Sequence, residues 1–340
     1  MSPPSSPATV PPSAAGSRAR FPHLDALRGI AALSVAGFHF ASEMPGTWFT
    51  ALFSKGWLGV EVFFVISGFI LPCALQARGS YSFPRHYPHF LWKRILRLHP
   101  PYLVTFGIVL ATWYVCSRVP GLPVSALAIT WQEVAAHPFL LNDVLGLRWV
   151  SDVFWTLAIE FQFYLLIGAL FPLLANRGRW LPAVVVLILA GLLPVPRVWL
   201  VPYLPVFALG ILAWKVMRDG ASPRVVCLLG GAAAMVAART LGIPAALVGA
   251  ATALAVVWWR RGVPRWLMAA GTVSYSLYLL HASIGGSVLQ WARRYALDEV
   301  PAQVLAFAAA LAASWVAALA LYRLVERPAL RWSAGRTFRD

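Results

Sequence analysis

An arginine and a histidine stand eleven residues apart within one apolar stretch near the start of the chain. They are Arg28 and His39, in residues 24–40. On an α-helix, eleven residues return to within about 20° of the starting face and rise roughly 16 Å. One helix would then carry a guanidinium near the membrane entrance and an imidazole deep in the bilayer, where ionisable groups are costly and are functional candidates. In the alternative interpretation, Arg28 extends to the lipid headgroups and His39 only bonds a neighbouring helix.

A carboxylate and a second imidazole lie in later apolar stretches. Glu160 and His281 are predicted to reach the same outer half of the bilayer as His39. The set suits a general base that takes a proton from a hydroxyl, with Glu160 steering the tautomer of His39. It also suits the metal or proton site of a transporter, since imidazole and carboxylate groups bind zinc and relay protons. Purely structural roles are the remaining alternatives: an ion pair for Glu160, and for His281 an interhelical hydrogen-bond stripe with Ser274, Tyr275 and Tyr278.

The elements that carry these residues are predicted to be membrane helices. The chain has 340 residues, of which 60% are apolar and 12% charged, whereas about a quarter of a soluble domain is charged. Apolar runs of about 20 residues, the length that spans a bilayer, recur from end to end. We therefore expect an all-α polytopic membrane protein with a bundle of about ten transmembrane helices. The expected helices cover residues 24–41, 57–77, 101–117, 152–175, 180–193, 199–217, 224–238, 242–259, 266–290 and 300–325.

Positive charge gives the expected orientation. With ten spans, the loops on the side of the two termini hold twenty Lys and Arg residues and the opposite loops hold seven. Because cytoplasmic loops are enriched in Lys and Arg, both termini are predicted to be cytoplasmic. The net charge of +16 does not indicate nucleic-acid binding, since the cations are dispersed between apolar runs rather than gathered on one face. The three cysteines are far apart and form no CxxC pair, so neither a zinc site nor a disulfide framework is indicated.

Three cations form a cluster before the third expected helix. Lys93, Arg94 and Arg97 lie on the side that the topology makes cytoplasmic. Together with Arg28 they suit phosphate groups, because guanidinium and ammonium groups pair with phosphate oxygens. The alternative is ordinary positive-inside anchoring. A phosphate-rich donor on the inside and a base near the outside would suit group transfer across the membrane.

Six short motifs, in order along the chain, resemble the integral-membrane acyltransferase-3 family, whose members are O-acyltransferases of bacterial surface sugars, exopolysaccharides and some antibiotics. Residues 24–31 with His39 match its opening motif and its Arg-x10-His signature. Residues 93–100 resemble its Arg-x-x-Arg motif, with Lys93 and His99 as variations. Residues 59–69, 155–164, 274–281 and 326–328 resemble further motifs. Each motif is weak alone, but the ordered set is specific and covers nearly all of the chain after the first twenty residues.

The resemblance implies a ten-helix fold in the bacterial cytoplasmic membrane, acyl-CoA (most simply acetyl-CoA) as the donor, and a hydroxyl acceptor; no metal is expected. It also implies that Arg28 and His39 are essential and that Arg94 and Arg97 lie on the donor side. The expected domains are a disordered cytoplasmic tail rich in Pro, Ser and Ala (1–20), a transmembrane acyltransferase domain (21–328) and a basic cytoplasmic tail (329–340).

We therefore predict a membrane-embedded O-acyltransferase that moves an acyl group from cytoplasmic acyl-CoA to a hydroxyl of a carbohydrate or glycoconjugate at the outer side. The alternative is a proton- or metal-coupled transporter that uses the same histidines and carboxylate. The expected catalytic residues are His39, as base or acyl carrier, with Glu160 and Arg28. The expected donor site is Arg28, Lys93, Arg94 and Arg97, and the expected substrate-binding residues are Glu61, Asp152, Tyr164, Tyr275 and His281. The sequence leaves the acceptor, the acyl length and the oligomeric state open.

Overall fold

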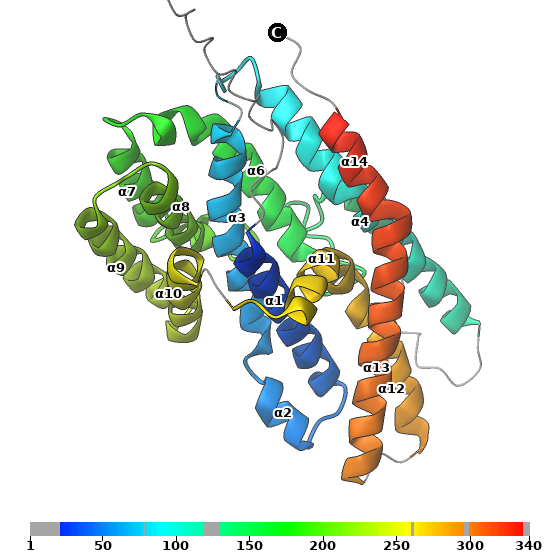
Figure 1. Ribbon diagram of the computed structural model, residues 1–340. Helices are drawn as coiled ribbons and strands as arrows, with labels where there is room; N and C mark the ends of the chain where they lie inside the picture. Colours follow the sequence, from blue (N-terminus) through cyan, green and yellow to red (C-terminus); the bar gives the residue numbers. More distant parts are fainter. Residues whose placement is uncertain are drawn as a thin grey trace, which may run out of the picture.

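The computed structural model describes residues 21–77, 79, 81–118, 129–259, 262–295 and 299–335. All regular secondary structure in these residues is helical, and ten principal helical segments coincide one by one with the ten predicted ones (Figure 1). The first five are α1 (Pro22–Ser42), α3 (Gly59–Gln76), α4 (Tyr87–Ser117), α6 (Trp155–Ala175) and α7 (Trp180–Ala190). The next three are α8 (Leu204–Arg218), α9 (Pro223–Thr240) and α10 (Ile243–Trp258).

The last two segments each contain a π turn. In the ninth, α11 (Arg265–Leu280) passes through the π turn His281–Gly285 into α12 (Gly286–Ala292). In the tenth, α13 (Val300–Leu321) passes through the π turn Tyr322–Glu326 into α14 (Arg327–Gly335). The short helices α2 (Trp48–Phe53) and α5 (Trp131–Ala136) lie in two connections. The predicted tail of residues 1–20 lies outside the described residues. Of the predicted tail of residues 329–340, residues 329–335 are instead part of the helix α14, and residues 336–340 lie outside the described residues.

The third predicted helix starts much earlier than expected. We predicted a start at Pro101, because two successive prolines remove backbone donors and usually mark a helix boundary. In the structure both Pro100 and Pro101 lie inside α4, which begins at Tyr87. Prolines are tolerated within membrane helices when neighbouring groups satisfy the freed carbonyls. The cations at positions 93, 94 and 97 are therefore helical residues and not loop residues.

Seven of the described helical stretches are long and apolar enough to cross a membrane, namely those that contain α1, α3, α4, α6, α8, α11 and α13. The apolar helices α7 and α10 are shorter than a full span, and α9 is not among the seven. The chain is thus an all-helical protein with several candidate membrane spans. The number of ten crossings and the cytoplasmic location of the termini stay predictions.

The directions of the helices agree with ten crossings. The aromatic ring of Phe64 stacks on that of Phe207, and Gln76 near the end of α3 accepts a hydrogen bond from the indole of Trp214 near the end of α8. The two helices α3 and α8 are therefore parallel. This arrangement requires the chain to reverse between α6 and α8, and α7 makes that reversal despite its length.

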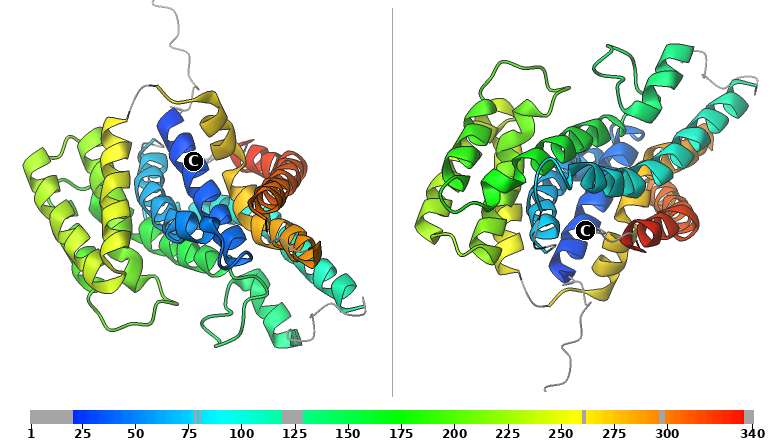
Figure 2. Two further views of the ribbon diagram at one scale, coloured as in Figure 1. Left: turned by 90° about the horizontal axis from the view of Figure 1, so that it is seen from below. Right: turned by 90° about the horizontal axis from the view of Figure 1, so that it is seen from above.

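A second parallel pair, α1 and α11, lies at the centre of the bundle. Helix α13 packs on α11 in the antiparallel direction. Figure 2 shows α7–α10 on one flank, α12–α14 on the other and α1 between them. The α1–α11 contact is the most extensive helix contact among the described residues. A Cβ atom on Gly271 would collide with the backbone of Asp25, and one on Gly29 would lie 2.7 Å from the carbonyl oxygen of Leu267. The two glycines thus allow a backbone-to-backbone approach of the kind that small residues give membrane helices.

We predict that Gly271→Ala destabilises the protein. The added methyl group has no space at the crossing, and overpacking a close contact typically costs about 1–3 kcal/mol. The matched control is Gly230→Ala on α9, where a Cβ meets nothing within 4 Å and alanine improves helix propensity. Thermal unfolding in detergent should give a lower Tm for Gly271→Ala only. Equal Tm values for the two variants would contradict the close crossing.

We also predict the sidedness of two exposed residues, Leu145 before α6 and Ser222 before α9. In a background without Cys73, Cys116 and Cys227, a cysteine at Leu145 should react with an impermeant maleimide in intact cells. A cysteine at Ser222 should react only after permeabilisation. If only the seven long helices crossed, α8 would be the fifth crossing and Ser222 would be external, so labelling of both positions in intact cells would rule out ten crossings.

Candidate active site

Two cavities lie in series beside α1. The cavity beside residues 24–28 of α1, called the inner cavity, has a volume of about 490 Å³. The cavity beside residues 35–39 of α1, called the outer cavity, has a volume of about 350 Å³. Val60 and Tyr278 line both of them, so these two side chains belong to the wall between the cavities. Arg28 lines the inner cavity and His39 the outer one. The side chains of Arg28 and His39 thus line two neighbouring cavities along α1.

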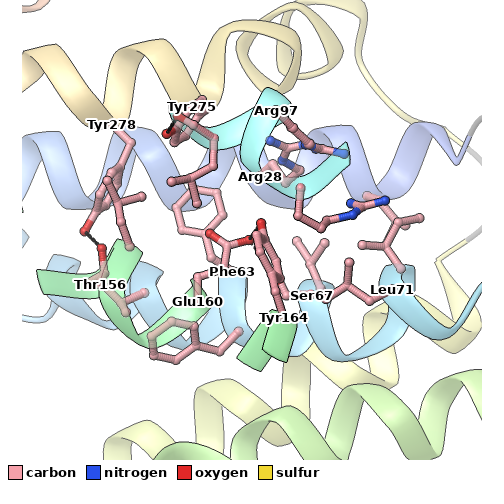
Figure 3. A pocket seen from close by; sticks show the side chains of 18 of the residues that line it. Arg28, Phe63, Ser67, Leu71, Arg97, Thr156, Glu160, Tyr164, Tyr275 and Tyr278 are labelled. Carbon is pink, nitrogen blue, oxygen red and sulfur yellow. Dashed lines mark hydrogen bonds between the residues drawn. The ribbon is translucent and has the colours of Figure 1, made fainter. Parts of the chain in front are cut away.

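The inner cavity carries an excess of positive charge. Its lining includes three arginines and two carboxyl side chains: Arg28, Arg94, Arg97, Asp25 and Glu160. Figure 3 shows Arg28 and Arg97 at one end of the cavity and the hydrogen-bonded pair of Thr156 and Tyr278 at the other. The arginines come from α1 and α4, so the close packing of several helices is needed to bring them together.

Glu160 is held on α6 by two hydroxyl groups. Ser67 donates to its Oε1 at 3.1 Å and Tyr164 donates to the same atom at 2.6 Å. These two hydrogen bonds fix the position of the Glu160 side chain. The hydroxyl of Tyr275, which also lines this cavity, donates to the carbonyl oxygen of Leu98 at 2.7 Å.

The expected pairing of Glu160 with His39 is therefore not what the structure shows. Glu160 lines the inner cavity and bonds Ser67 and Tyr164, whereas the ring that packs on His39 is that of His281. The expectation was based on depth along each helix. Depth does not fix the direction in which a helix turns its side chain, and the described arrangement turns Glu160 toward the arginines.

The outer cavity combines an imidazole with carboxylates and aromatic rings. His39 shares it with Glu61, Asp152 and Arg197, and its aromatic lining residues are Phe38, Trp57, Trp155, Tyr203 and Tyr278. Glu61 is only 3% exposed, and its Oε2 has no hydrogen-bond partner among the described residues. A buried carboxylate oxygen without a donor costs free energy, so this atom is suited to receive a hydrogen bond from a ligand.

The wall between the cavities is tied to α6. The hydroxyl of Tyr278 lies 2.7 Å from Oγ1 of Thr156 and donates to the carbonyl oxygen of Val153 at 3.2 Å. The ring of Phe63 packs edge-on against Tyr278. Val60 completes the shared part of the wall with a small apolar side chain. Access from one cavity to the other therefore depends on a few side chains and not on the helix backbone.

The segment before α6 is held by a buried histidine. His137 donates from Nδ1 to the carbonyl oxygen of Glu133, and its Nε2 accepts from the backbone N–H of Val150. Hydrogen bonds from the backbone of Thr130 and from Arg148 lower the pKa of Glu133 to about 2. These hydrogen bonds hold residues 130–150 in place, and this segment leads into Asp152 and α6.

The remaining predicted site residues divide between the two cavities. Tyr164 and Tyr275, expected to bind substrate, line the inner cavity, whereas Glu61 and Asp152 line the outer one. Lys93 and His281 line neither cavity. The backbone oxygen of Lys93 accepts a hydrogen bond from Ser333 of α14, which places this residue at the α4–α14 contact.

Sequence reasoning missed Arg197, Tyr203 and Trp57 as lining residues of the outer cavity. Arg197 was counted only as one of the seven cations in outer loops. Its position in a Pro-rich connection, on the same side as Asp152, was the one available indication. In the structure its guanidinium also donates to the carbonyl oxygen of Thr240 at 2.7 Å, which ties this connection to α9.

A helical bundle with several candidate spans, and with two cavities that contain ionisable side chains among mainly apolar ones, is the architecture of an integral membrane protein with a site between its helices. The sequence model of the acyltransferase-3 family, described as an acyltransferase domain, matches residues 21–319. The chain belongs to this family. It is accordingly a membrane O-acyltransferase, and the transporter alternative gives way to an enzyme.

Similar proteins extend this assignment. The chain is 28% identical to acyltransferase MdmB of Streptomyces mycarofaciens, over 92% of each chain. It is 30% identical to the putative peptidoglycan O-acetyltransferase YrhL of Bacillus subtilis, over 43% of this chain and 23% of YrhL. It is 27% identical to the peptidoglycan O-acetyltransferase OatA of Listeria monocytogenes, over 56% of this chain and 30% of OatA. The matches thus span less than a third of the length of YrhL and OatA. No solved structure matches the chain significantly.

Proposed function

We propose that the protein transfers an acyl group, acetyl in the simplest case, from cytoplasmic acyl-CoA to a hydroxyl of a carbohydrate or glycoconjugate on the outer side of the membrane. One observation carries the proposal: a cationic cavity and a histidine-carboxylate cavity lie in series and share the wall of Val60 and Tyr278. A donor and an acceptor in these two chambers would meet at that wall.

The inner cavity suits the donor's phosphates by its charge. Arg28, Arg94 and Arg97 supply guanidinium groups that can each bind a phosphate oxygen in a bidentate manner. The cavity volume of about 490 Å³ lies within the range of small-molecule sites. The donor's phosphates would lie at the arginines and its acyl end would extend toward Tyr278. Bound acyl-CoA supplies an activated acyl group whose leaving group is a thiolate.

His39 is the residue suited to move the proton in the outer cavity. As a base, its neutral ring takes the proton of the acceptor hydroxyl while that oxygen bonds to the thioester carbonyl carbon. The carbon–sulfur bond breaks, and the departing thiolate takes the proton from His39. As an acyl carrier, the unprotonated ring nitrogen attacks the thioester carbonyl carbon, and the carbon–sulfur bond breaks to release the thiolate. The hydroxyl oxygen then attacks the acyl carbon, the carbon–nitrogen bond breaks to free the ring, and the hydroxyl proton neutralises the thiolate. Both routes require an unprotonated nitrogen that faces the cavity.

The outer cavity has groups suited to a hydroxyl-rich acceptor. Glu61 and Asp152 can accept hydrogen bonds from hydroxyls, and Trp57 and Trp155 offer apolar rings against which a sugar face can pack. The names of YrhL and OatA as peptidoglycan O-acetyltransferases support an acceptor of this class. The acceptor site would thus recognise hydroxyls at one end and an apolar face at the other.

We predict that Arg94→Ala and Arg97→Ala weaken acyl-CoA binding. Each substitution removes a charge-assisted hydrogen bond, worth about 1.5–3 kcal/mol, so Kd should rise roughly 10–100-fold. Arg→Lys should restore only part of the affinity, because an ammonium cannot make the bidentate contact. The Kd is measured by isothermal titration calorimetry of the purified protein with acetyl-CoA.

Lys93→Ala is the matched control, since it removes a neighbouring cation of α4 that does not line the cavity. We expect this variant to bind acetyl-CoA with the affinity of the wild type. An equal loss of affinity in Lys93→Ala and Arg97→Ala would mean that the cluster acts through overall positive charge. No loss in any variant would mean that the cluster serves only to orient the protein in the membrane.

We predict that His39→Gln inserts, binds acyl-CoA and transfers almost nothing. An amide can replace a hydrogen bond, but it cannot take the proton, and loss of a general base typically costs 10²–10⁴ in rate. Wild-type turnover should rise with pH through the histidine range, because only the neutral ring is active. Thiol release from acetyl-CoA by protein in liposomes measures both effects. Retention of more than about a tenth of wild-type turnover would exclude His39 from either role.

A further inference from the structure

A second histidine, His281, packs against the ring of His39 and does not line the outer cavity. The ring centroids of His39 and His281 are 5.1 Å apart, and the rings are inclined by 52°. His281 is fully buried and lines neither cavity, whereas His39 lines the outer one. His281 therefore has no direct route to a substrate in either chamber. Any part that it plays in the reaction must pass through His39.

The hydrogen bonds of His281 define which of its nitrogens carries the proton. Its Nδ1 lies 3.1 Å from the carbonyl oxygen of Leu277. A carbonyl oxygen only accepts, so Nδ1 is the donor, and in the neutral ring Nε2 is an acceptor. This Nε2 is buried and has no hydrogen-bond partner among the described residues. Such an acceptor requires a donor nearby.

The imidazole of His39 is the ring placed to supply that donor. The ring centroids are 5.1 Å apart, about the separation that an edge-to-edge N–H···N bond of about 2.9 Å requires. No hydrogen bond joins these two described rings in the structure, so the bond requires the His39 ring to turn its N–H toward Nε2 of His281. The ring of Tyr278 also contacts His281, but its hydroxyl is already directed to Thr156 and to the carbonyl oxygen of Val153. Ser314 of α13, whose Oγ also lacks a partner among the described residues, is the one competing donor near this turn.

We propose that His281 is the positioning residue of His39 and selects its reactive tautomer. Nε2 of His281 accepts the N–H of the neutral His39 ring. The hydrogen of His39 is thereby held on the buried side, and the lone pair of its other nitrogen faces the outer cavity. This inference rests on the proposed function, in which that lone pair takes the hydroxyl proton or the acyl group.

The local fold supports a fixed His39–His281 pair. His281 begins the π turn at the end of α11, and π turns inside helices frequently occur at functional sites. The ring of Phe40 packs against His281, and a Cβ on Gly285 would collide with that ring. Phe40 of α1 therefore packs against both His281 and Gly285 of the π turn, and this packing fixes the position of the adjacent His39.

A neutral partner suits these surroundings better than a carboxylate. Glu61, Asp152 and Arg197 share the outer cavity with His39, and one turn further along α1 Glu43 forms an ion pair with Arg293. The other titratable neighbours of His281 are His39 itself and Tyr278 of its own helix. An ionised carboxylate in place of His281 would have to be buried without a counter-ion, which is costly. An imidazole orients the partner ring without that charge.

The test combines three variants with a chemical readout that does not need turnover. His281→Phe removes the acceptor, His281→Gln retains an amide oxygen that can accept, and Ser314→Ala removes the competing donor. Diethyl pyrocarbonate reacts with an unprotonated imidazole nitrogen, so mass spectrometry of the modified protein across a pH series reports the accessible lone pair of His39. The loop residue His86 serves as the internal reference. Thiol release from acetyl-CoA is measured in parallel.

We expect slower modification of His39 in His281→Phe, partial recovery in His281→Gln and no change in Ser314→Ala. The kcat of thiol release should fall roughly 10–100-fold in His281→Phe, as when the partner that orients a functional histidine is lost, with an unchanged KM for acetyl-CoA. If His281→Phe does not fold, His281→Leu against His281→Gln gives the same comparison.

Equal modification of His39 in the wild type and in folded His281→Phe or His281→Leu would overturn the proposal. A slower rate in Ser314→Ala would also overturn it, since Ser314 would then be the partner of the pair. Absence of thiol release from the wild type, together with slower modification in His281→Phe, would remove the proposed function and leave the His39–His281 pair standing.

Discussion

The close parallel contact of α1 with α11 is the constraint on which the rest of the structure depends. Gly29 and Gly271 allow the two backbones to touch near one end of the pair. Ten residues further along each helix, His39 and His281 pack ring against ring. A small residue at the crossing is worth more in a membrane than in water, because lipid tails provide no hydrophobic driving force between helices. The crossing therefore sets both the level and the facing of the two imidazoles.

Placing two chambers along α1 resolves an electrostatic conflict. In the proposed reaction His39 takes up a proton, and guanidinium groups beside it would disfavour the protonated ring. The inner cavity confines the cationic charge to Arg28, Arg94 and Arg97, while the wall with Tyr278 separates these groups from His39. Because interactions between charges are strong where water is excluded, this separation limits the repulsion between the arginines and a proton on His39. Transfer between the chambers then requires passage only at the wall.

Two carboxylates of the described bundle, Glu160 and Glu326, accept hydrogen bonds from side chains on other helices. Glu160 is satisfied by Ser67 and Tyr164. Glu326 at the end of the second π turn accepts a hydrogen bond from Ser276 at 2.6 Å. Since unsatisfied polar groups are costly in a membrane, these pairs also select the rotation of the helices that carry them. Function and folding therefore draw on the same contacts.

Much of the fold could be read from the sequence. Apolar runs located ten principal helical segments, and the eleven-residue spacing placed Arg28 and His39 on one face of α1. These are local properties, because hydropathy and helical period depend only on residues near one another in the chain. The start of α4 was missed because Pro100 and Pro101 are tolerated inside it, and that tolerance comes from neighbours.

What only the tertiary structure decided is which residues share a chamber. Residue types and depth along a helix grouped Glu160 with His39 and Lys93 with the donor arginines, yet the cavities separate both pairs. The rotation of one helix about its axis relative to another is set by interhelical packing, at contacts such as Gly271 with Asp25. Those contacts join residues that are hundreds of positions apart. The sequence therefore determined the chemical groups and their depth, and the packing of helices determined which of these groups meet.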